Sequence, residues 1–206
     1  REYPAMKPLL IKLIFPLLIL NAPALAQTTT PAASAQAEPE TLVLSDTLNY
    51  DDKTKTSIFN GNVILTRGQM RLTSDTLKIQ EDAQGFQHGT ATVNNGKVHI
   101  FEERPETYET IRSEGDRAEY NGKDDTVKMI GHAIVNRYIC GKLIDTVRGE
   151  VVIYNNKNNT YSAQGGPQAV EPGRVRSIVK PQSAADEATE ACRKQYNNKP
   201  MPSTLN

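Results

Sequence analysis

The chain has no tryptophan, only four phenylalanines and only two cysteines among its 206 residues. It has no excess of either charge, because 24 Lys and Arg are matched by 24 Asp and Glu. A nucleic-acid-binding domain normally carries a concentrated basic patch, so this balance argues against a nucleic-acid partner. The cysteines form no CxxC pair and have no nearby histidine, which disfavours a metal site.

Long apolar runs are missing except near the N-terminus. There, Lys7 and Lys12 flank the start of a run from Leu9 to Leu20, and Ala24-Leu25-Ala26 has the small-x-small pattern of a signal-peptide cleavage site. The run is shorter than the roughly 20 apolar residues that span a bilayer. We therefore expect residues 1–26 to be a cleaved signal peptide, with an uncleaved anchor as the alternative.

Composition divides the rest of the chain into three parts. Residues 27–40 are rich in Thr, Ala, Pro and Gln and are expected to form a disordered linker. Residues 41–181 are long enough for one domain with a core. Residues 182–206 are polar and are expected to be a flexible tail. Disulfides persist in oxidising compartments, so Cys140 and Cys192 could pin this tail to the domain, although free thiols remain an alternative.

An internal register runs through the domain: an acidic residue begins an alternating segment and a glycine follows 14 or 15 positions later. The pairs are Asp46 with Gly61, Asp75 with Gly89, Asp116 with Gly131, and Glu150 with Gly165. A fixed period indicates stacked copies of one supersecondary unit. We expect the acid to mark the start of a strand and the glycine to mark a bend in the returning strand.

The alternation is of period two, with β-branched enrichment and turn residues such as Asn94-Asn95-Gly96 and Asn121-Gly122 between the runs. This pattern predicts an all-β, antiparallel meander of roughly a dozen short strands, with one apolar face and one polar face. Residues 102–113 interrupt the spacing and are expected to form a loop. Two curled sheets could enclose either a packed core or an open apolar groove, and the pattern does not separate these.

Several segments resemble the periplasmic lipopolysaccharide-transport proteins of the organic-solvent-tolerance family. The resemblance covers about residues 41–180. It is carried by Leu44-Ser45-Asp46, Phe59-Asn60-Gly61-Asn62-Val63-Ile64-Leu65-Thr66-Arg67-Gly68, Ser74-Asp75-Thr76-Leu77, Gly115-Asp116-Arg117-Ala118-Glu119-Tyr120, Met129-Ile130-Gly131-His132-Ala133 and Arg174-Val175-Arg176-Ser177-Ile178-Val179. The cysteine pair and the tail after Gln182 depart from the family pattern.

The resemblance implies a repetitive, twisted β jelly roll of two facing sheets, open at both ends, that carries lipopolysaccharide from the inner to the outer membrane. It also implies a periplasmic location, end-to-end self-association, and contacts with similar domains on the inner-membrane transporter and the outer-membrane translocon. No catalytic residue, metal or cofactor is expected. The acyl chains of lipid A would lie between the sheets.

We assign to lipid binding the apolar residues in phase with the periodic acids. They are Leu48, Tyr50, Phe59, Val63, Leu65, Met70, Leu72, Leu77, Ile79, Ala118, Tyr120, Val127 and Met129. The register is harder to fix for a further group: Val93, Val98, Ile100, Val135, Val152 and Tyr154.

Two other functions fit a repetitive β domain. A polysaccharide-active enzyme would need converging carboxylates, one with a raised pKa. The periodic acids recur once per copy, which favours a shared structural role, and His88, His99 and His132 lack ligand spacing. A structural or adhesive domain would show the same periodicity without a lipid ligand.

Overall fold

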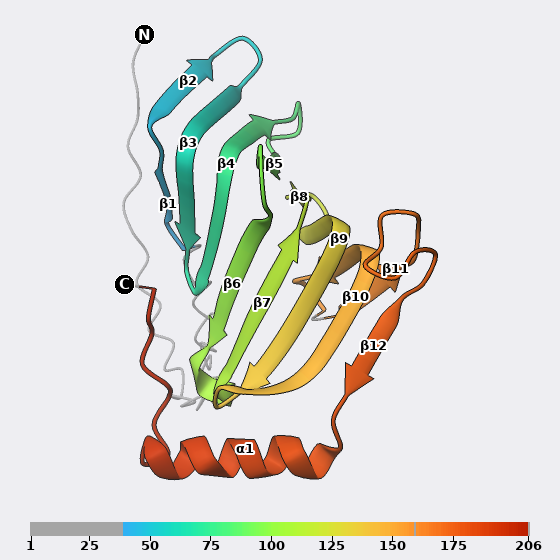
Figure 1. The fold of residues 1–206 in the computed structure, drawn as a ribbon. Coiled ribbons are helices and arrows are strands. Elements are labelled where there is room, and N and C mark those ends of the chain that lie inside the picture. The colour runs from blue at the N-terminus through green and yellow to red at the C-terminus, as the bar shows by residue number, and fades with distance from the viewer. Residues whose placement is uncertain (1–38, 159, 206) are drawn as a thin grey trace, which may run out of the picture. The chain divides into compact units, whose positions relative to one another are not determined.

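In the computed structural model, residues 39–158 and 160–205 can be described, and they form one antiparallel sheet of twelve strands with a single α-helix (Figure 1). The predicted signal peptide and most of the predicted linker lie outside the described residues. Within the described ranges, no helix is long and apolar enough to cross a membrane.

The strands follow the alternating runs of the sequence. They are β1 (Thr41–Leu44), β2 (Thr47–Asp51), β3 (Thr56–Arg67), β4 (Met70–Glu81), β5 (Gln87–Thr92), β6 (Val98–Arg104), β7 (Glu109–Gly115), β8 (Arg117–Asn121), β9 (Thr126–Ile139), β10 (Lys142–Asn155), β11 (Thr160–Gln164) and β12 (Arg176–Val179). A 3-10 turn, η1 (Pro105–Thr107), joins β6 to β7, and α1 (Gln182–Gln195) follows β12.

Four long strands, β3, β4, β9 and β10, each have 12 or 14 residues and belong to two half-sheets. The first half-sheet has the order β2-β3-β4-β5-β8-β9-β10-β11. The second has the order β1-β3-β4-β6-β7-β9-β10-β12. We call the line along which the long strands cross from one half-sheet to the other the waist, and the turns at their far ends the rims.

The crossing is made by a bulge in β3 and another in β9. Pairing between β3 and β4 shifts register between Asn60 and Val63, and within this step Gly61 has φ +81° and Asn62 φ +46°. β9 repeats the step at Gly131, with φ +76°, and His132, with φ +46°. Bulges add twist and bend the strand, so the glycines Gly61 and Gly131 mark bends as expected.

The carboxyl groups of two periodic acids lie against these bends. The backbone N–H of Asp46 donates to the carbonyls of Asn60 and Gly61 at 3.1 and 3.0 Å, and that of Asp116 donates to Gly131 at 2.9 Å. The bulged neighbours bind the side chains: Asn62 Nδ2 lies 3.0 Å from Asp46 Oδ2. His132 Nδ1 lies 2.8 Å from Asp116 Oδ2.

The expectation that every acid begins a strand, and every glycine bends one, is only half correct. Asp75 and Glu150 lie inside β4 and β10, where they accept backbone N–H groups of Asn94, at 2.7 Å, and Gln168, at 3.2 Å. These acids anchor the segments that connect β5 to β6 and β11 to β12 at the waist. Their glycines differ in role, because Gly89 pairs with Ile79 inside β5 and Gly165 follows the end of β11.

The twelve strands form two copies of a six-strand unit rather than four equal repeats. β1 to β6 and β7 to β12 each run short, short, long, long, short, short. Leu48 pairs with Phe59 as Ala118 pairs with Met129, and Leu77 pairs with Ala91 as Val152 pairs with Ala163. The copies are joined inside the chain where β5 pairs with β8 and β6 pairs with β7.

The C-terminal residues are ordered, contrary to the expected flexible tail. α1 packs Ala185 and Ala188 against Ile139 and Ile144, and a disulfide joins Cys140 in the β9–β10 turn to Cys192 in α1. The expectation of a flexible tail was wrong because the segment is polar on average. Its few small apolar residues are buried only because they pack against this rim. Residues 102–113, expected to be a loop, form the end of β6, η1 and the start of β7.

Residues after α1 run along the outside of the second half-sheet. Glu103 is 2% exposed and accepts hydrogen bonds from Ser203 Oγ at 2.7 Å and from the backbone N–H of Thr204 at 3.0 Å. Burial alone would raise the pKa of Glu103, but these hydrogen bonds outweigh it and lower the pKa. Arg71 also donates to the carbonyl of Leu205 at 3.0 Å. The tail therefore covers part of the outer face of the second half-sheet.

The bend at the waist predicts a specific cost for a side chain at Gly131. A Cβ there would collide with the carboxyl group of Asp116, whereas one at Gly141, which also has positive φ (+71°), would meet no atom within 4 Å. Gly141→Ala should cost roughly 1–2 kcal/mol for the left-handed conformation alone. Gly131→Ala should cost at least about 1 kcal/mol more because of the collision. Chemical unfolding of both variants measures the difference, and equal losses would show that the Asp116 contact does not constrain the bend.

Candidate functional site

The apolar faces of the two half-sheets meet in one cluster. Val63, Val98 and Val147 come from the second half-sheet, and Leu77 and Met129 come from the first. Val98 and Ala133 are completely buried and Val63 is 1% exposed. The half-sheets are therefore packed together near the waist, and we call their facing sides the inner face.

Apolar side chains farther from the waist on β3, β4 and the start of β9 are less buried, whereas Ile139 and Ile144 at the β9–β10 rim are buried against α1. Phe59, Ile79 and Val127 in the first half-sheet are only partly buried, as are Leu65 and Met70 in the second. We call the region between the two rims, where these partly buried side chains lie, the mouth.

The structure brings together ten of the thirteen residues assigned to the apolar face. They are Phe59, Val63, Leu65, Met70, Leu72, Leu77, Ile79, Ala118, Val127 and Met129. Of the residues with uncertain register, Val93, Val98, Ile100, Val135 and Val152 join the same cluster. The strand alternation therefore placed most of this face correctly, although their role in binding lipid stays a prediction.

Three assigned residues lie elsewhere. Leu48 and Tyr50 are 55% and 59% exposed, because β2 is a terminal strand and no further strand covers it among the described residues. Tyr120 lies on the same side of β8 as Ala118, but its hydroxyl donates a hydrogen bond to Asp125 in the β8–β9 turn at 3.2 Å. Tyr154, of uncertain register, is bound to Arg104 near the mouth.

The inner face of the second half-sheet becomes charged towards its rim. Along β6, Val98 and Ile100 are followed in the same phase by Glu102 and Arg104. Arg104 Nε donates to Glu102 at 2.8 Å. Burial opposes the charge of Arg104, but the contacts with Glu102 outweigh burial and raise the guanidinium pKa.

Arg137 continues this charged rim on β9. It donates to Glu109 Oε1 at 2.6 Å through one terminal nitrogen and to Asp145 Oδ2 at 2.6 Å through Nε. These charged residues were not assigned to the site from sequence. The available signal was the alternation itself, which continues past the last apolar residue of each strand.

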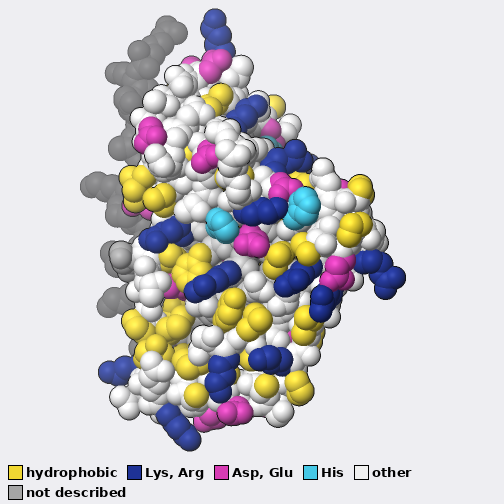
Figure 2. Space-filling model, in the orientation of Figure 1, with side chains coloured by type: hydrophobic (Ala, Val, Ile, Leu, Met, Phe, Trp, Pro, Cys, Tyr) yellow, Lys and Arg dark blue, Asp and Glu magenta, His cyan; other side chains and the backbone are white. Residues whose placement is uncertain are grey.

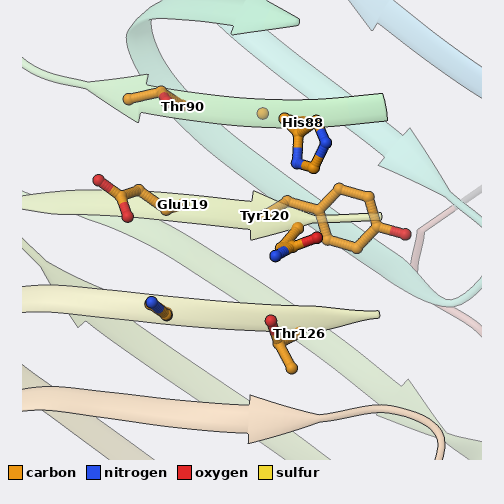
Figure 3. A pocket seen from close by; sticks show the side chains of 8 residues that line it. His88, Thr90, Glu119, Tyr120 and Thr126 are labelled. Carbon is orange, nitrogen blue, oxygen red and sulfur yellow. The ribbon is translucent and has the colours of Figure 1, made fainter. Parts of the chain in front are cut away.

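The outer faces carry polar features of a different kind. A hollow of about 230 Å³ lies over β5, β8 and β9, with His88, Thr90, Glu119, Tyr120 and Thr126 among its lining residues (Figure 3). It contains no converging pair of carboxylates. On the face shown in Figure 2, acidic, basic and hydrophobic side chains are interspersed, so no stripe of one charge crosses it.

Comparison with known proteins assigns the fold and the family. Residues 42–160 match the family described as LptA/(LptD N-terminal domain) LPS transport protein. The chain belongs to this family. The match runs from β1 to the start of β11, and so includes the first six-strand unit, most of the second, both bulges at the waist and most of the inner face.

Two comparisons with LptH of Pseudomonas aeruginosa, one of sequence and one of structure, agree with this family. The lipopolysaccharide export system protein LptH is 24% identical over 174 residues, which cover 82% of this chain and 95% of LptH. The crystal structure of LptH, described as the LptA-homologous periplasmic component of the lipopolysaccharide transport device, matches with a TM-score of 0.58 at 21% identity. That match covers 69% of this chain and 96% of the LptH chain, and it supports the twisted jelly-roll fold.

Proposed function

We propose that this protein binds lipopolysaccharide through the acyl chains of lipid A and carries it from the inner to the outer membrane as part of a periplasmic bridge. The observation that carries the proposal is the apolar inner face, which continues through both six-strand units and is only partly buried at the mouth. Membership of the transport family supports it. Export to the periplasm would depend on the signal peptide predicted within residues 1–26.

Acyl chains that move along an apolar face are transferred without exposure to water. Each methylene of an acyl chain gains about 0.8 kcal/mol on leaving water, so a lipid with several chains leaves an apolar surface very slowly. A face that runs across all strands lets the chains shift from one strand pair to the next without that penalty. Binding and movement of this kind require no catalytic group.

The absence of tryptophan from the sequence permits a direct test. Phe59→Trp would place one reporter on the inner face, and Ile58→Trp would place a matched control on the other side of β3, at a residue that is 36% exposed. Addition of lipid A should shift the emission of the Phe59→Trp variant to shorter wavelength and protect it from acrylamide. The Ile58→Trp variant should not respond.

Two results would contradict lipid binding on the inner face. A response confined to the Ile58→Trp variant would place the lipid on the outer face. No response from either variant, together with no lipid A co-purifying by mass spectrometry, would favour a structural or adhesive domain.

A bridge also requires contacts between copies, and the two ends of the sheet suit them. On the N-terminal edge, Leu42 and Leu44 are each 53% exposed. On the C-terminal edge, Tyr161 is 59% exposed and Val179 66% exposed. Unpaired edges with apolar side chains are templates for strand addition, so we propose end-to-end association with a second copy and with similar domains at the two membranes.

The junction inside the chain supports this association and gives it a register. There, Ala91 of the first unit pairs with Ala118 of the second. Ala163 occupies the place of Ala91 at the end of the second unit, and Leu48 occupies the place of Ala118 at the start of the first. Repetition of the internal junction between molecules would therefore pair Ala163 of one copy with Leu48 of the next.

Disulfide trapping tests this register. Directly opposed antiparallel residues have Cα atoms about 4.5–5.5 Å apart, within the range that a disulfide bridges. A mixture of Ala163→Cys and Leu48→Cys variants should form covalent dimers under mild oxidation, while the native Cys140–Cys192 disulfide remains closed. Asn49→Cys, one position out of register, is the control. Equal trapping with Asn49→Cys, or none with Leu48→Cys, would contradict the proposed junction.

A further inference from the structure

Two arginines of the second half-sheet lie at the rim end of its inner face. Arg67 follows Leu65 in phase on β3, and Arg104 follows Ile100 in phase on β6. Both therefore lie beyond the apolar cluster, beside the mouth. An amphiphile with its acyl chains on the inner face would present its polar part at this level.

The nitrogens of Arg104 contact residues of both half-sheets. Nε donates to Glu102 at 2.8 Å, and Nη1 lies 3.7 Å from Glu109 Oε2, both within the second half-sheet. Nη2 instead donates to the hydroxyl of Tyr154 at 2.8 Å, and the guanidinium lies 5.6 Å from the centre of that ring. Tyr154 follows Val152 in phase on the first half-sheet. This hydrogen bond therefore crosses the mouth.

Arg67 lies close to another tyrosine, Tyr120 on β8, which also belongs to the first half-sheet. Burial and the nearby Asp125 raise the pKa of the Tyr120 phenol, and Arg67 acts in the opposite direction. A tyrosine of the first half-sheet thus lies beside each of these arginines, and Arg104 donates a hydrogen bond to the phenol of Tyr154.

A phosphate group is a stronger partner than a phenol for these nitrogens. Guanidinium and phosphate carry opposite charges and often form two parallel hydrogen bonds, whereas a phenol is neutral and offers a single acceptor oxygen. The carboxylates of Glu102 and Glu109 can keep Arg104 in place while Nη2 changes partner. Arg137 differs, because all three of its nitrogens are bound to carboxylates of its own half-sheet.

We propose that Arg104, with Arg67, binds phosphate groups of an anionic amphiphile whose acyl chains lie on the inner face, displacing Tyr154. Loss of the Arg104–Tyr154 hydrogen bond removes a link across the mouth and allows the half-sheets to separate as the chains enter. The assignment rests on the proposed function, since it takes the ligand to be a lipid held at the inner face. It adds the residues that recognise the polar part and the chemistry they recognise.

The test compares bisphosphorylated lipid A with lipid A of the same acyl chains from which the phosphates have been removed. Arg104→Gln should weaken binding of the phosphorylated lipid roughly tenfold, as expected for loss of a hydrogen bond to a charged group. Binding of the dephosphorylated lipid should not change. Arg112→Gln is the matched control, because Arg112 lies between Phe101 and Tyr138 and is out of phase with the inner face.

Tyr154→Phe provides a second test that keeps the ring and removes only the phenol. It should bind the phosphorylated lipid a few-fold more tightly than the wild type, because no hydroxyl competes for Arg104. Inorganic phosphate alone should bind much more weakly than the lipid. Circular dichroism and thermal unfolding confirm that each variant is folded.

The outcomes separate this inference from the proposed function. Equal losses for both lipids with Arg104→Gln, or weaker binding with Tyr154→Phe, would overturn phosphate recognition while leaving lipid binding intact. Inorganic phosphate that binds as tightly as lipid A would overturn the link to an amphiphile. Failure of the wild-type protein to bind either lipid would instead refute the proposed function.

Discussion

Four long strands pass from one half-sheet to the other, and the rest of the structure depends on the bulges with which two of them, β3 and β9, make this crossing. At each of the bulges at Gly61 and Gly131, the glycine and the residue after it both have positive φ. Only glycine leaves room for the carboxyl groups of Asp46 and Asp116 beside the bend. The backbone N–H of each acid also donates to the carbonyl of the bulge glycine, and its carboxylate binds the side chain of the next residue. Each acid therefore fixes both the position and the direction of the bend at the waist.

Folding the sheet at this line gives the protein both of its proposed properties. The bend turns the apolar sides of all the long strands towards each other, which produces an inner face that is closed at the waist and only partly buried at the mouth. The same bend leaves both ends of the sheet open, at β1 and β2 and at β11 and β12, since a folded sheet, unlike a closed barrel, retains edges. Lipid would then travel across the strands, in the direction in which further copies could extend the sheet.

Period-two alternation was sufficient to predict the fold class and most of the inner face, because one buried side fixes the phase of a strand. It failed where exposure depends on distant partners. Leu48 and Tyr50 have the phase of core residues but lie on a terminal strand. α1 has a polar composition, yet its small apolar residues are buried against the β9–β10 rim, and Cys140 and Cys192 join it there. The Arg104–Tyr154 contact joins residues 50 positions apart across the fold, and no local pattern indicates it.

The central claim is that the acyl chains of lipopolysaccharide contact the inner face, and photocrosslinking in cells tests it most directly. A photoreactive amino acid at Leu65, which is partly buried on the inner face of β3, should yield a crosslinked product recognised by an antibody against lipopolysaccharide. The same group at the adjacent Thr66, which points to the other side of the strand, should yield none. Crosslinking at Thr66 but not at Leu65, or at neither position with the protein folded and exported, would contradict the account.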